Sequence, residues 1–157
     1  MLSLPVEAAI AHPVGKQKFA TRIELPGGAI IADEPVEVGG GGAGATPYQL
    51  LSAALAACSS MTLRLYAARK GLALGDFSVS VDHDLVGGRD RFTRRLSFPA
   101  SVGPEVRAQL TDIAGKCPVH RTLGLGGAEI VTVIEPAPPV GDPPTAHVEQ
   151  MEQACAD

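Results

Sequence analysis

The sequence predicts an α+β protein in which antiparallel strands pack on helices. Strand-like and helix-like segments follow one another along the chain in the order β-β-α-β-β-α-β. Two pairs of strand-like segments are separated by short glycine-containing turns, which is typical of antiparallel hairpins. One long helical segment is apolar around nearly its whole circumference, which indicates burial on all sides. At 157 residues, the chain is long enough for one domain with a real core.

The first pair of strands is predicted at residues 18–25 and 29–32, with the turn at Pro26-Gly27-Gly28. The stretch from Val38 to Gly44 then contains five glycines in seven residues. It is either a flexible loop or a backbone that must pass close to a bulky neighbour. It lacks the Gly-Lys-Ser/Thr ending that holds phosphate and magnesium.

The long helix is predicted to begin at Pro47, with Thr46 as its N-cap, and to end at Gly71. Its apolar surface between residues 50 and 61 predicts a central helix that is wrapped by sheet and possibly shared with a second subunit. Its small residues would permit another backbone to approach closely. These residues are Ala53, Ala54, Ala56 and Ala57.

The second pair of strands is predicted at residues 77–85 and 91–98. A second helix should begin at Pro104 and run to about residue 116. A last strand is expected at residues 129–134.

The end of the chain differs in composition, because five of the thirteen prolines lie between Pro136 and Pro144. We therefore predict a single domain at 1–135 and a proline-rich tail at 136–157, in which residues 147–156 form a short helix.

Composition excludes several classes of protein. The net charge of −4 and the pI near 5.5 give no basic surface for nucleic acid. Aromatic residues make up only 4% and tryptophan is absent, which argues against a base-stacking platform. We find no cationic start followed by an apolar run, and no uninterrupted apolar stretch long enough for a membrane span. The expectation is a cytoplasmic protein that binds neither nucleic acid nor membrane.

The three cysteines are Cys58, Cys117 and Cys155. An odd count argues against a secreted disulfide framework. Cys58 lies about three turns inside the long helix, where burial would raise its pKa and the helix N-terminus is too distant to lower it. From position alone, Cys58 is more typical of packing than of chemistry. Cys155 lies near the end of the chain and is assigned no role.

Cys117 is in a different position, because it precedes Pro118. If Pro118 begins a short helical turn, Cys117 is its N-cap and the exposed N–H groups would stabilise a thiolate. His120 and Arg121 could add positive charge or could be surface residues beside a turn. Cys117 and His120 could also be half of a metal site. However, one such pair without a second is weak support for zinc, and we expect no metal.

Two residues of the second strand pair share the parity of its apolar side chains. Arg94 alternates with Phe92 and Leu96, so it could point inward and meet a carboxylate or a thiolate. His83 lies at the end of the apolar face of its strand. For both residues we favour the simpler interpretation, that they face solvent.

Four segments together resemble the OsmC/Ohr family of osmotically inducible and organic hydroperoxide resistance proteins. They are Gly39-Gly40, the helix start from Thr46-Pro-Tyr-Gln to Cys58, the segment Met61-Thr-Leu-Arg-Leu-Tyr-Ala-Ala-Arg-Lys-Gly71, and Cys117-Pro-Val-His-Arg-Thr-Leu123. Asp33-Glu-Pro35 also fits one branch of the family. The resemblance runs from about residue 18 to residue 134, and its two cysteine motifs in this order make it specific.

The resemblance implies an intertwined homodimer, in which curved antiparallel sheets wrap two long central helices and the active sites lie at the subunit interface. It implies that Cys58 is the peroxidatic cysteine and Cys117 the resolving cysteine. The implied reaction is peroxide reduction through a Cys58 sulfenic acid and a Cys58–Cys117 disulfide. An external dithiol, possibly of lipoyl type, would reduce the disulfide, and no metal or organic prosthetic group is required.

The sequence also departs from the family pattern. Peroxidase members carry a glutamate after the helix-opening proline, where this chain has Tyr48, and that glutamate pairs with an arginine from the N-terminal strands. Arg22 is the only arginine in these strands, and Lys16 and Lys18 compete with it for that role. Arg121 or His120 could stabilise the thiolate instead.

A second hypothesis follows from the missing glutamate and the apolar helix. The same scaffold could serve a non-enzymatic protein that binds an apolar small molecule or senses redox state. A cysteine hydrolase is a third hypothesis, but no Cys–His–Asp arrangement of recognisable spacing supports it.

Overall fold

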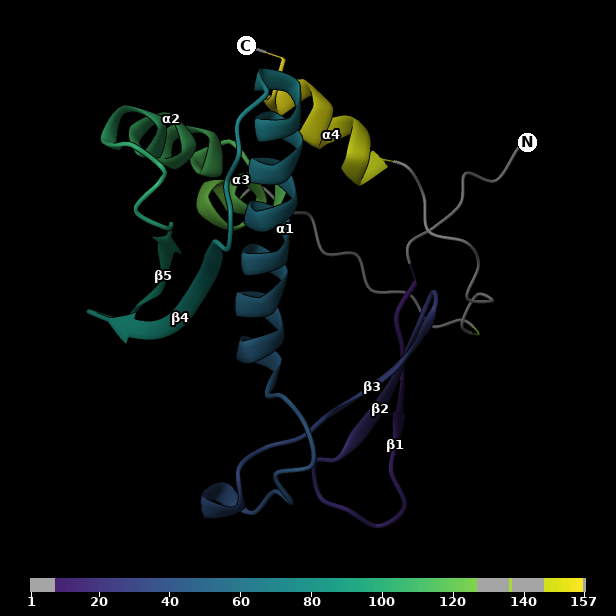
Figure 1. Cartoon of the computed structure of the whole chain (residues 1–157). Coiled ribbons are helices and arrows are strands. Elements are labelled where there is room, and N and C mark those ends of the chain that lie inside the picture. Colours follow the sequence, from purple (N-terminus) through teal and green to yellow (C-terminus); the bar gives the residue numbers. More distant parts are fainter. Residues whose placement is uncertain (1–7, 127–135, 137–145, 157) are drawn as a thin grey trace. The chain divides into compact units, whose positions relative to one another are not determined.

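The computed structural model describes residues 8–126, 136 and 146–156, which fall into two compact units. The N-terminal unit contains the described residues up to Leu50 together with Pro136. The second unit contains the described residues from Leu51 to residue 126 and those of the C-terminal helix. The mixed helices and antiparallel strands confirm the predicted α+β class (Figure 1).

The N-terminal unit contains a three-stranded antiparallel sheet in the order β1-β2-β3. Its strands are β1 (Ile10–Pro13), β2 (Thr21–Leu25) and β3 (Gly28–Ala32). The hairpin of β2 and β3 confirms the first predicted strand pair, although β2 begins three residues later than expected. The sequence does not predict β1, because its four residues are mostly exposed and end in proline, so they show no alternation of apolar side chains.

The glycine-rich loop that follows β3 packs tightly against the strand that precedes it. After the short 3-10 helix η1 (Val36–Val38), a Cβ atom on Gly40 would lie 1.9 Å from the Glu34 carbonyl oxygen. A Cβ atom on Gly44 would lie 1.9 Å from the Ile31 carbonyl oxygen. Glycine is therefore required at both positions by close approach of backbone, and the interpretation as a merely flexible loop is wrong.

Asp33 fixes this loop from the end of β3. Its buried carboxylate accepts hydrogen bonds from the backbone N–H groups of Ala43 and Gly41, at 3.1 and 3.0 Å. The N–H of Ala43 is the main cause that lowers the pKa of Asp33, because these hydrogen bonds favour the charged carboxylate.

Helix α1 (Pro47–Lys70) has the predicted ends. Thr46 Oγ1 accepts the backbone N–H of Gln49 at 3.2 Å, and Gln49 Oε1 accepts that of Thr46 at 2.9 Å, which is a capping box. Gly71 stops the helix with a φ of +64°, and Leu72 N–H donates to the Ala67 carbonyl oxygen at 2.8 Å.

By length and composition alone, α1 would be able to cross a membrane, despite the polar residues that interrupt it. Core helices of soluble proteins meet the same criteria, and 44% of the relevant stretch of α1 is buried inside the structure. The finding is therefore weak support for a membrane span.

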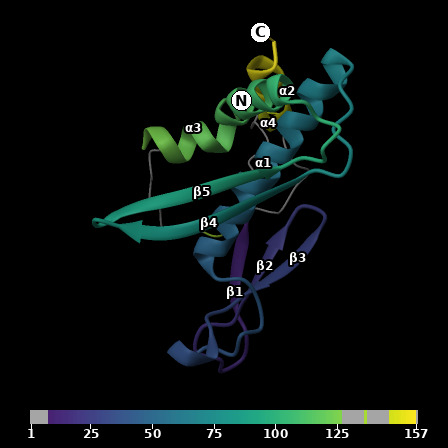
Figure 2. The same cartoon turned by 60° about the vertical axis from the view of Figure 1, so that its left-hand side comes forward.

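The second unit contains a long hairpin of β4 (Ser78–Val86) and β5 (Arg89–Ser97), which lies across α1 (Figure 2). Its turn is shorter than the connection at residues 86–90 that the predicted strands leave, because Gly87 and Gly88, with φ of +59° and +75°, reverse the chain at once. The remaining helices are α2 (Pro104–Gly115), α3 (Pro118–Leu125) and α4 (Ala146–Ala154). The last predicted strand, at 129–134, lies outside the described residues.

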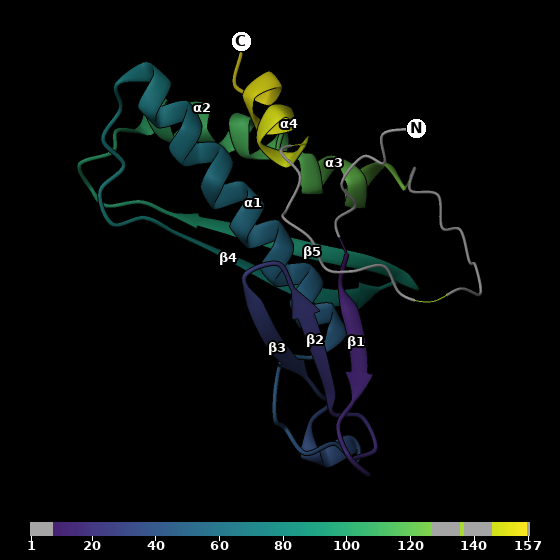
Figure 3. The same ribbon diagram turned by 90° about the vertical axis from the view of Figure 1, so that its right-hand side faces the viewer.

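The core of the second unit has two clusters, both on α1. The larger cluster joins α1 to α2 and α4, which lie beside the C-terminal half of α1 (Figure 3). Its buried members are Leu63, Tyr66, Ala67, Leu74, Val102, Leu110, Ile113, Ala114 and Cys155. The smaller cluster consists of Leu55, Cys58 and Cys117, with Val81, Phe92, Val119 and Leu123 packed against it.

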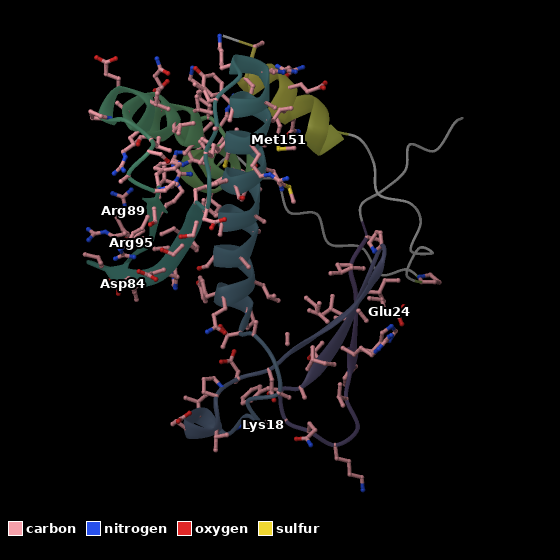
Figure 4. The ribbon with its side chains drawn as sticks, viewed as in Figure 1. Lys18, Glu24, Asp84, Arg89, Arg95 and Met151 are labelled. Carbon is pink, nitrogen blue, oxygen red and sulfur yellow. The ribbon has the colours of Figure 1, made fainter. Side chains whose placement is uncertain are left out.

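Helix α4 confirms the short helix predicted near the C-terminus. Its Met151 is buried and labelled in Figure 4, and its Cys155 lies in the larger cluster. Arg69 Nη1 on α1 also donates to the Glu152 carbonyl oxygen at 3.1 Å. The end of the predicted tail therefore packs against α1. The domain boundary at residue 135 stays a prediction.

Candidate functional site

Cys58 and Cys117 lie together in the smaller core cluster. Cys58 comes from the middle of α1 and Cys117 from the residue before α3, and only 2% and 0% of their surfaces are exposed. The thiol of Cys58 hydrogen-bonds the sulfur of Cys117. No disulfide joins any of the three cysteines, all of which belong to the described residues. The site is a buried dithiol.

Cys117 is the N-cap of α3, as the sequence predicts. Its extended backbone, at φ −62° and ψ 143°, turns its sulfur toward the first turn of α3, where Sγ accepts the backbone N–H of His120 at 3.3 Å. The hydroxyl of Ser59, which follows Cys58 on α1, lies 3.8 Å from the same sulfur. A thiolate at this position is stabilised by both donors.

Arg94 approaches this site from β5. It pairs with Val81 across the hairpin, and its Nη1 donates to Ser59 Oγ at 3.0 Å and to the Ala114 carbonyl oxygen at 2.9 Å. The prediction that Arg94 faces solvent is wrong. The strand keeps its alternation to this point, and the acceptors on α1 and α2 hold one nitrogen of the guanidinium group inside the unit.

His83 also lies inward rather than in solvent. Its ring is 4.9 Å from that of Phe92, and its Nε2 is 2.8 Å from Asp90 Oδ1. Only 18% of its side chain is exposed, so the solvent-facing interpretation is wrong here as well.

The surroundings shift the pKa values of the two thiols in opposite directions. The hydrogen bond from Cys58 is the main cause that lowers the pKa of Cys117, and the His120 N–H, the Ser59 hydroxyl and the charge of Arg94 act in the same direction. The pKa of Cys58 is raised, because its thiol hydrogen-bonds Cys117 and because it is buried. The pair therefore ionises first at Cys117.

The other predicted stabilisers are distributed as follows. His120 reaches Cys117 through its backbone N–H, and its ring is exposed. Arg121 is exposed and lines a cavity of about 960 Å³ between α3 and α4. Arg22 and Tyr48 belong to the N-terminal unit, where Arg22 forms an ion pair with Glu24 and Tyr48 is 49% exposed. The roles of these side chains toward Cys58 stay predictions.

A cavity of about 380 Å³ adjoins the cysteine cluster. Its lining is half apolar and half polar, and Leu55 and Phe92 belong both to the cavity and to the cluster. The other lining residues are Arg94, Leu96, Thr111 and His120. A small apolar molecule in this cavity would lie beside the side chains that enclose the two sulfurs.

Neither the third cysteine nor a cluster of metal ligands adds a second candidate site within the described residues. Cys155 is buried, which raises its pKa, and its thiol lies 3.6 Å from the Thr62 carbonyl oxygen, to which it donates. Within the described part of the chain, no cluster of three or more histidines, cysteines or carboxylates could hold a metal ion.

Sequence reasoning missed two residues of this site, Ser59 and Arg94. The signal for Arg94 is its parity with the apolar residues Phe92 and Leu96 of β5. Ser59 had no signal beyond its place next to Cys58.

Fold and site together define an α+β protein with a buried pair of cysteines. Residues 39–132 match the family profile described as OsmC-like protein, which spans more than half of the chain. The protein belongs to the OsmC family.

Solved structures show the same fold. An osmotic stress induced and detoxification response protein from Psychrobacter arcticus is 17% identical, with a TM-score of 0.64 over 78% of this chain and 91% of that one. An organic hydroperoxide resistance protein from Legionella pneumophila is 23% identical, with a TM-score of 0.54 over 77% and 90%. One from Elizabethkingia anophelis is also 23% identical, with a TM-score of 0.56 over 79% and 92%. No curated protein matches the sequence.

Proposed function

We propose that this protein reduces organic hydroperoxides with Cys58 and Cys117 as a dithiol. The observation that carries the proposal is the hydrogen-bonded pair of buried cysteines next to a cavity that Leu55 and Phe92 help to line. Family membership supports it, because similar structures are organic hydroperoxide resistance proteins. The protein acts in the cytoplasm and responds to oxidative stress.

The reaction has three steps. The sulfur of Cys58 attacks the terminal oxygen of the hydroperoxide, the O–O bond breaks, and an alcohol leaves while Cys58 becomes a sulfenic acid. The sulfur of Cys117 then attacks the Cys58 sulfur and displaces hydroxide, which forms the disulfide. An external dithiol, of lipoyl type, reduces this disulfide by thiol exchange and is itself oxidised to a disulfide. The protein needs no metal and no prosthetic group for these steps.

A second candidate function is the binding of an apolar molecule without turnover, as a carrier or redox sensor. The apolar residues of the cavity lining, Leu55, Phe92 and Leu96, favour this function. Tyr48 favours it too, because it stands in place of the glutamate that the family resemblance leads one to expect.

Turnover of cumene hydroperoxide with dihydrolipoamide as reductant tests the proposal. We expect the wild-type protein to consume hydroperoxide, and Cys58→Ser and Cys117→Ser to fall to the background rate. Cys155→Ser is the matched control. It removes a buried thiol outside the pair but keeps a donor for the Thr62 carbonyl, so it should retain turnover.

Turnover that persists in Cys58→Ser would contradict the proposal. Absence of turnover in the wild-type protein, together with an apolar molecule that co-purifies and is seen by mass spectrometry, would support the binding function instead.

We also propose that the protein forms a homodimer through α1. Large apolar side chains lie exposed along this helix, including Leu51 at 42% and Met61 at 49%, with the exposed alanines Ala53, Ala54 and Ala57 near them. A second copy would cover this face.

Light scattering on the full chain should give the mass of a dimer, and Ala57→Arg should shift the mass toward a monomer. The same substitution at the exposed Ala108 on α2 should leave the dimer intact, and a wild-type monomer would contradict the proposal.

A further inference from the structure

The guanidinium group of Arg94 is the cation whose charge acts on the cysteine pair among the described residues. One of its nitrogens, Nη1, serves two acceptors on different helices, the Ser59 hydroxyl on α1 and the Ala114 carbonyl on α2. Ala114 lies three residues before Cys117. Arg94 thus ties the two backbone segments that carry the two cysteines.

Ser59 connects Arg94 to the sulfur of Cys117. Its oxygen accepts from Arg94, and its one proton has two possible acceptors, the Leu55 carbonyl at 2.7 Å and Cys117 Sγ at 3.8 Å. A hydroxyl whose oxygen accepts from a cation is a stronger donor. When Cys117 is ionised, its negative charge attracts this proton away from the Leu55 carbonyl.

From this geometry we infer that Arg94, acting through Ser59, is a positioning residue that keeps Cys117 ionised while Cys58 retains its proton. The catalytic consequence of this inference rests on the proposed function, whereas the ionisation itself does not. The pair then holds one proton between two sulfurs at neutral pH.

The elements around Cys117 contribute few other ionisable groups. Helix α1 contributes Cys58 and β5 contributes Arg94. Cys155, which follows α4, lies in the larger core cluster, where its thiol donates to a carbonyl of α1. Strand β4 presents the apolar Val81, and its His83 lies against the ring of Phe92 and contacts Asp90. The charged groups near the end of α2 are Lys116 and Asp112, which form an ion pair at 3.6 Å. On α3, the ring of His120 and the side chain of Arg121 are exposed.

The arrangement supplies a base for Cys58. As Cys58 attacks the hydroperoxide, its proton passes to the Cys117 thiolate, and the OH group of the hydroperoxide moves to the Cys58 sulfur. The departing alkoxide takes the proton back from Cys117 and leaves as the alcohol. Cys117, again a thiolate, attacks the Cys58 sulfenic acid and releases hydroxide. The Cys117 thiolate thus acts as the base that accepts the proton of Cys58. The chain therefore needs no carboxylate at position 48, where it has Tyr48.

The ultraviolet absorbance of thiolate, followed during a pH titration of the reduced full-length protein, tests the inference and does not require access of a reagent to the buried sulfurs. We expect one thiolate to form well below the pH at which free cysteine ionises. Arg94→Gln should raise that pKa by about one unit, which is about a tenfold loss of thiolate at a pH below the transition. Ser59→Ala should shift it in the same direction, and Arg94→Lys should restore part of the effect.

Arg95→Gln is the matched control. Arg95, labelled in Figure 4, is the next residue on β5. Its side chain is 60% exposed and forms an ion pair with Asp82. Its substitution should leave the titration unchanged. A circular dichroism spectrum of each variant checks that it is folded.

Two outcomes would overturn the inference. One is a folded Arg94→Gln protein that titrates like the wild type. The other is a Cys117→Ser protein that keeps the low-pH thiolate, because Cys58 would then be the ionised sulfur. These outcomes are distinct from failure of the proposed function. If the protein shows no peroxide turnover but its thiolate still depends on Arg94, the proposed reaction is wrong and the inference about Arg94 stands.

Discussion

Cys58 and Cys117 carry the same thiol group, yet their surroundings shift their pKa values in opposite directions. Cys117 lies at the N-terminus of a helix, where it accepts a backbone N–H and lies near a hydroxyl that accepts from Arg94. Cys58 lies mid-helix and hydrogen-bonds Cys117. The hydrogen bond from Cys58, together with the N-cap position of Cys117, therefore makes Cys117 the sulfur that ionises first.

This difference predicts how stability depends on pH. Between the lowered folded pKa of Cys117 and the ordinary thiol value of 9.0, the unfolded chain holds two protons on the pair and the folded chain holds one. The contribution of the pair to stability therefore rises with pH in this window, by at most about 1.4 kcal/mol per pH unit. Above 9.0 it falls, because the unfolded chain loses both protons while folded Cys58 keeps its own.

Urea unfolding at a series of pH values would measure this dependence under reducing conditions. The free energy of unfolding of the wild-type protein minus that of Cys117→Ser should rise with pH up to about 9 and not beyond. A difference that is flat with pH would show that the two thiols titrate normally in the folded protein.

At the same scale, the sequence predicted the N-cap position of Cys117 but not the neighbours of its sulfur. The N-cap follows from a local rule, that a proline begins a helix at its first position. The contact between Ser59 and Cys117 joins residues 58 positions apart, and no local rule places them together. The inward side chain of Arg94 was open to prediction from strand parity, but its partners lie on two other elements.

Among the elements, the loop after β3 shows how a composition signal can mislead. Five glycines in seven residues are typical of flexibility, but here Gly40 and Gly44 allow the loop to pack against the backbone of residues 31 and 34. The carboxylate of Asp33 then holds the loop through two of its N–H groups. The loop leads directly into the capped start of α1.

Gly44→Ala tests this account of the loop. Its Cβ would lie 1.9 Å from the Ile31 carbonyl oxygen, so backbone must shift, and we expect a loss of about 1–3 kcal/mol in the free energy of unfolding. Gly115→Ala at the end of α2 is the control, because a Cβ there meets nothing within 4 Å. It should change stability by less than about 1 kcal/mol. Equal effects of the two substitutions in urea unfolding would contradict close packing of the loop.

The ends of α1 were predicted correctly because both are set by local chemistry, the Thr46–Gln49 capping box and the left-handed Gly71. Strand boundaries were less accurate. Strand β1, before the first hairpin, has no apolar alternation. The turn at Gly87 and Gly88 is shorter than the connection at residues 86–90 between the predicted strands.

For the molecule as a whole, the fold class was predictable because helix and strand periodicities alternate clearly along the chain. The packing of α4 against α1 was not, since a proline-rich stretch precedes this helix and its short amphipathic pattern does not identify a partner. The contact between Cys58 and Cys117 also depends on the fold of the whole molecule. Their positions alone favoured packing for Cys58, and only the family resemblance linked the two.

The most direct test of the central claim, that Cys58 and Cys117 form a peroxide-reducing dithiol, is a free-thiol count before and after one equivalent of cumene hydroperoxide. It is followed by peptide mapping of the full-length protein. The account predicts that two of the three thiols per chain disappear, that the map shows a Cys58–Cys117 disulfide, and that Cys155 stays reduced. If Cys58 and Cys117 stayed reduced, or reacted no faster than free cysteine, the claim would be wrong.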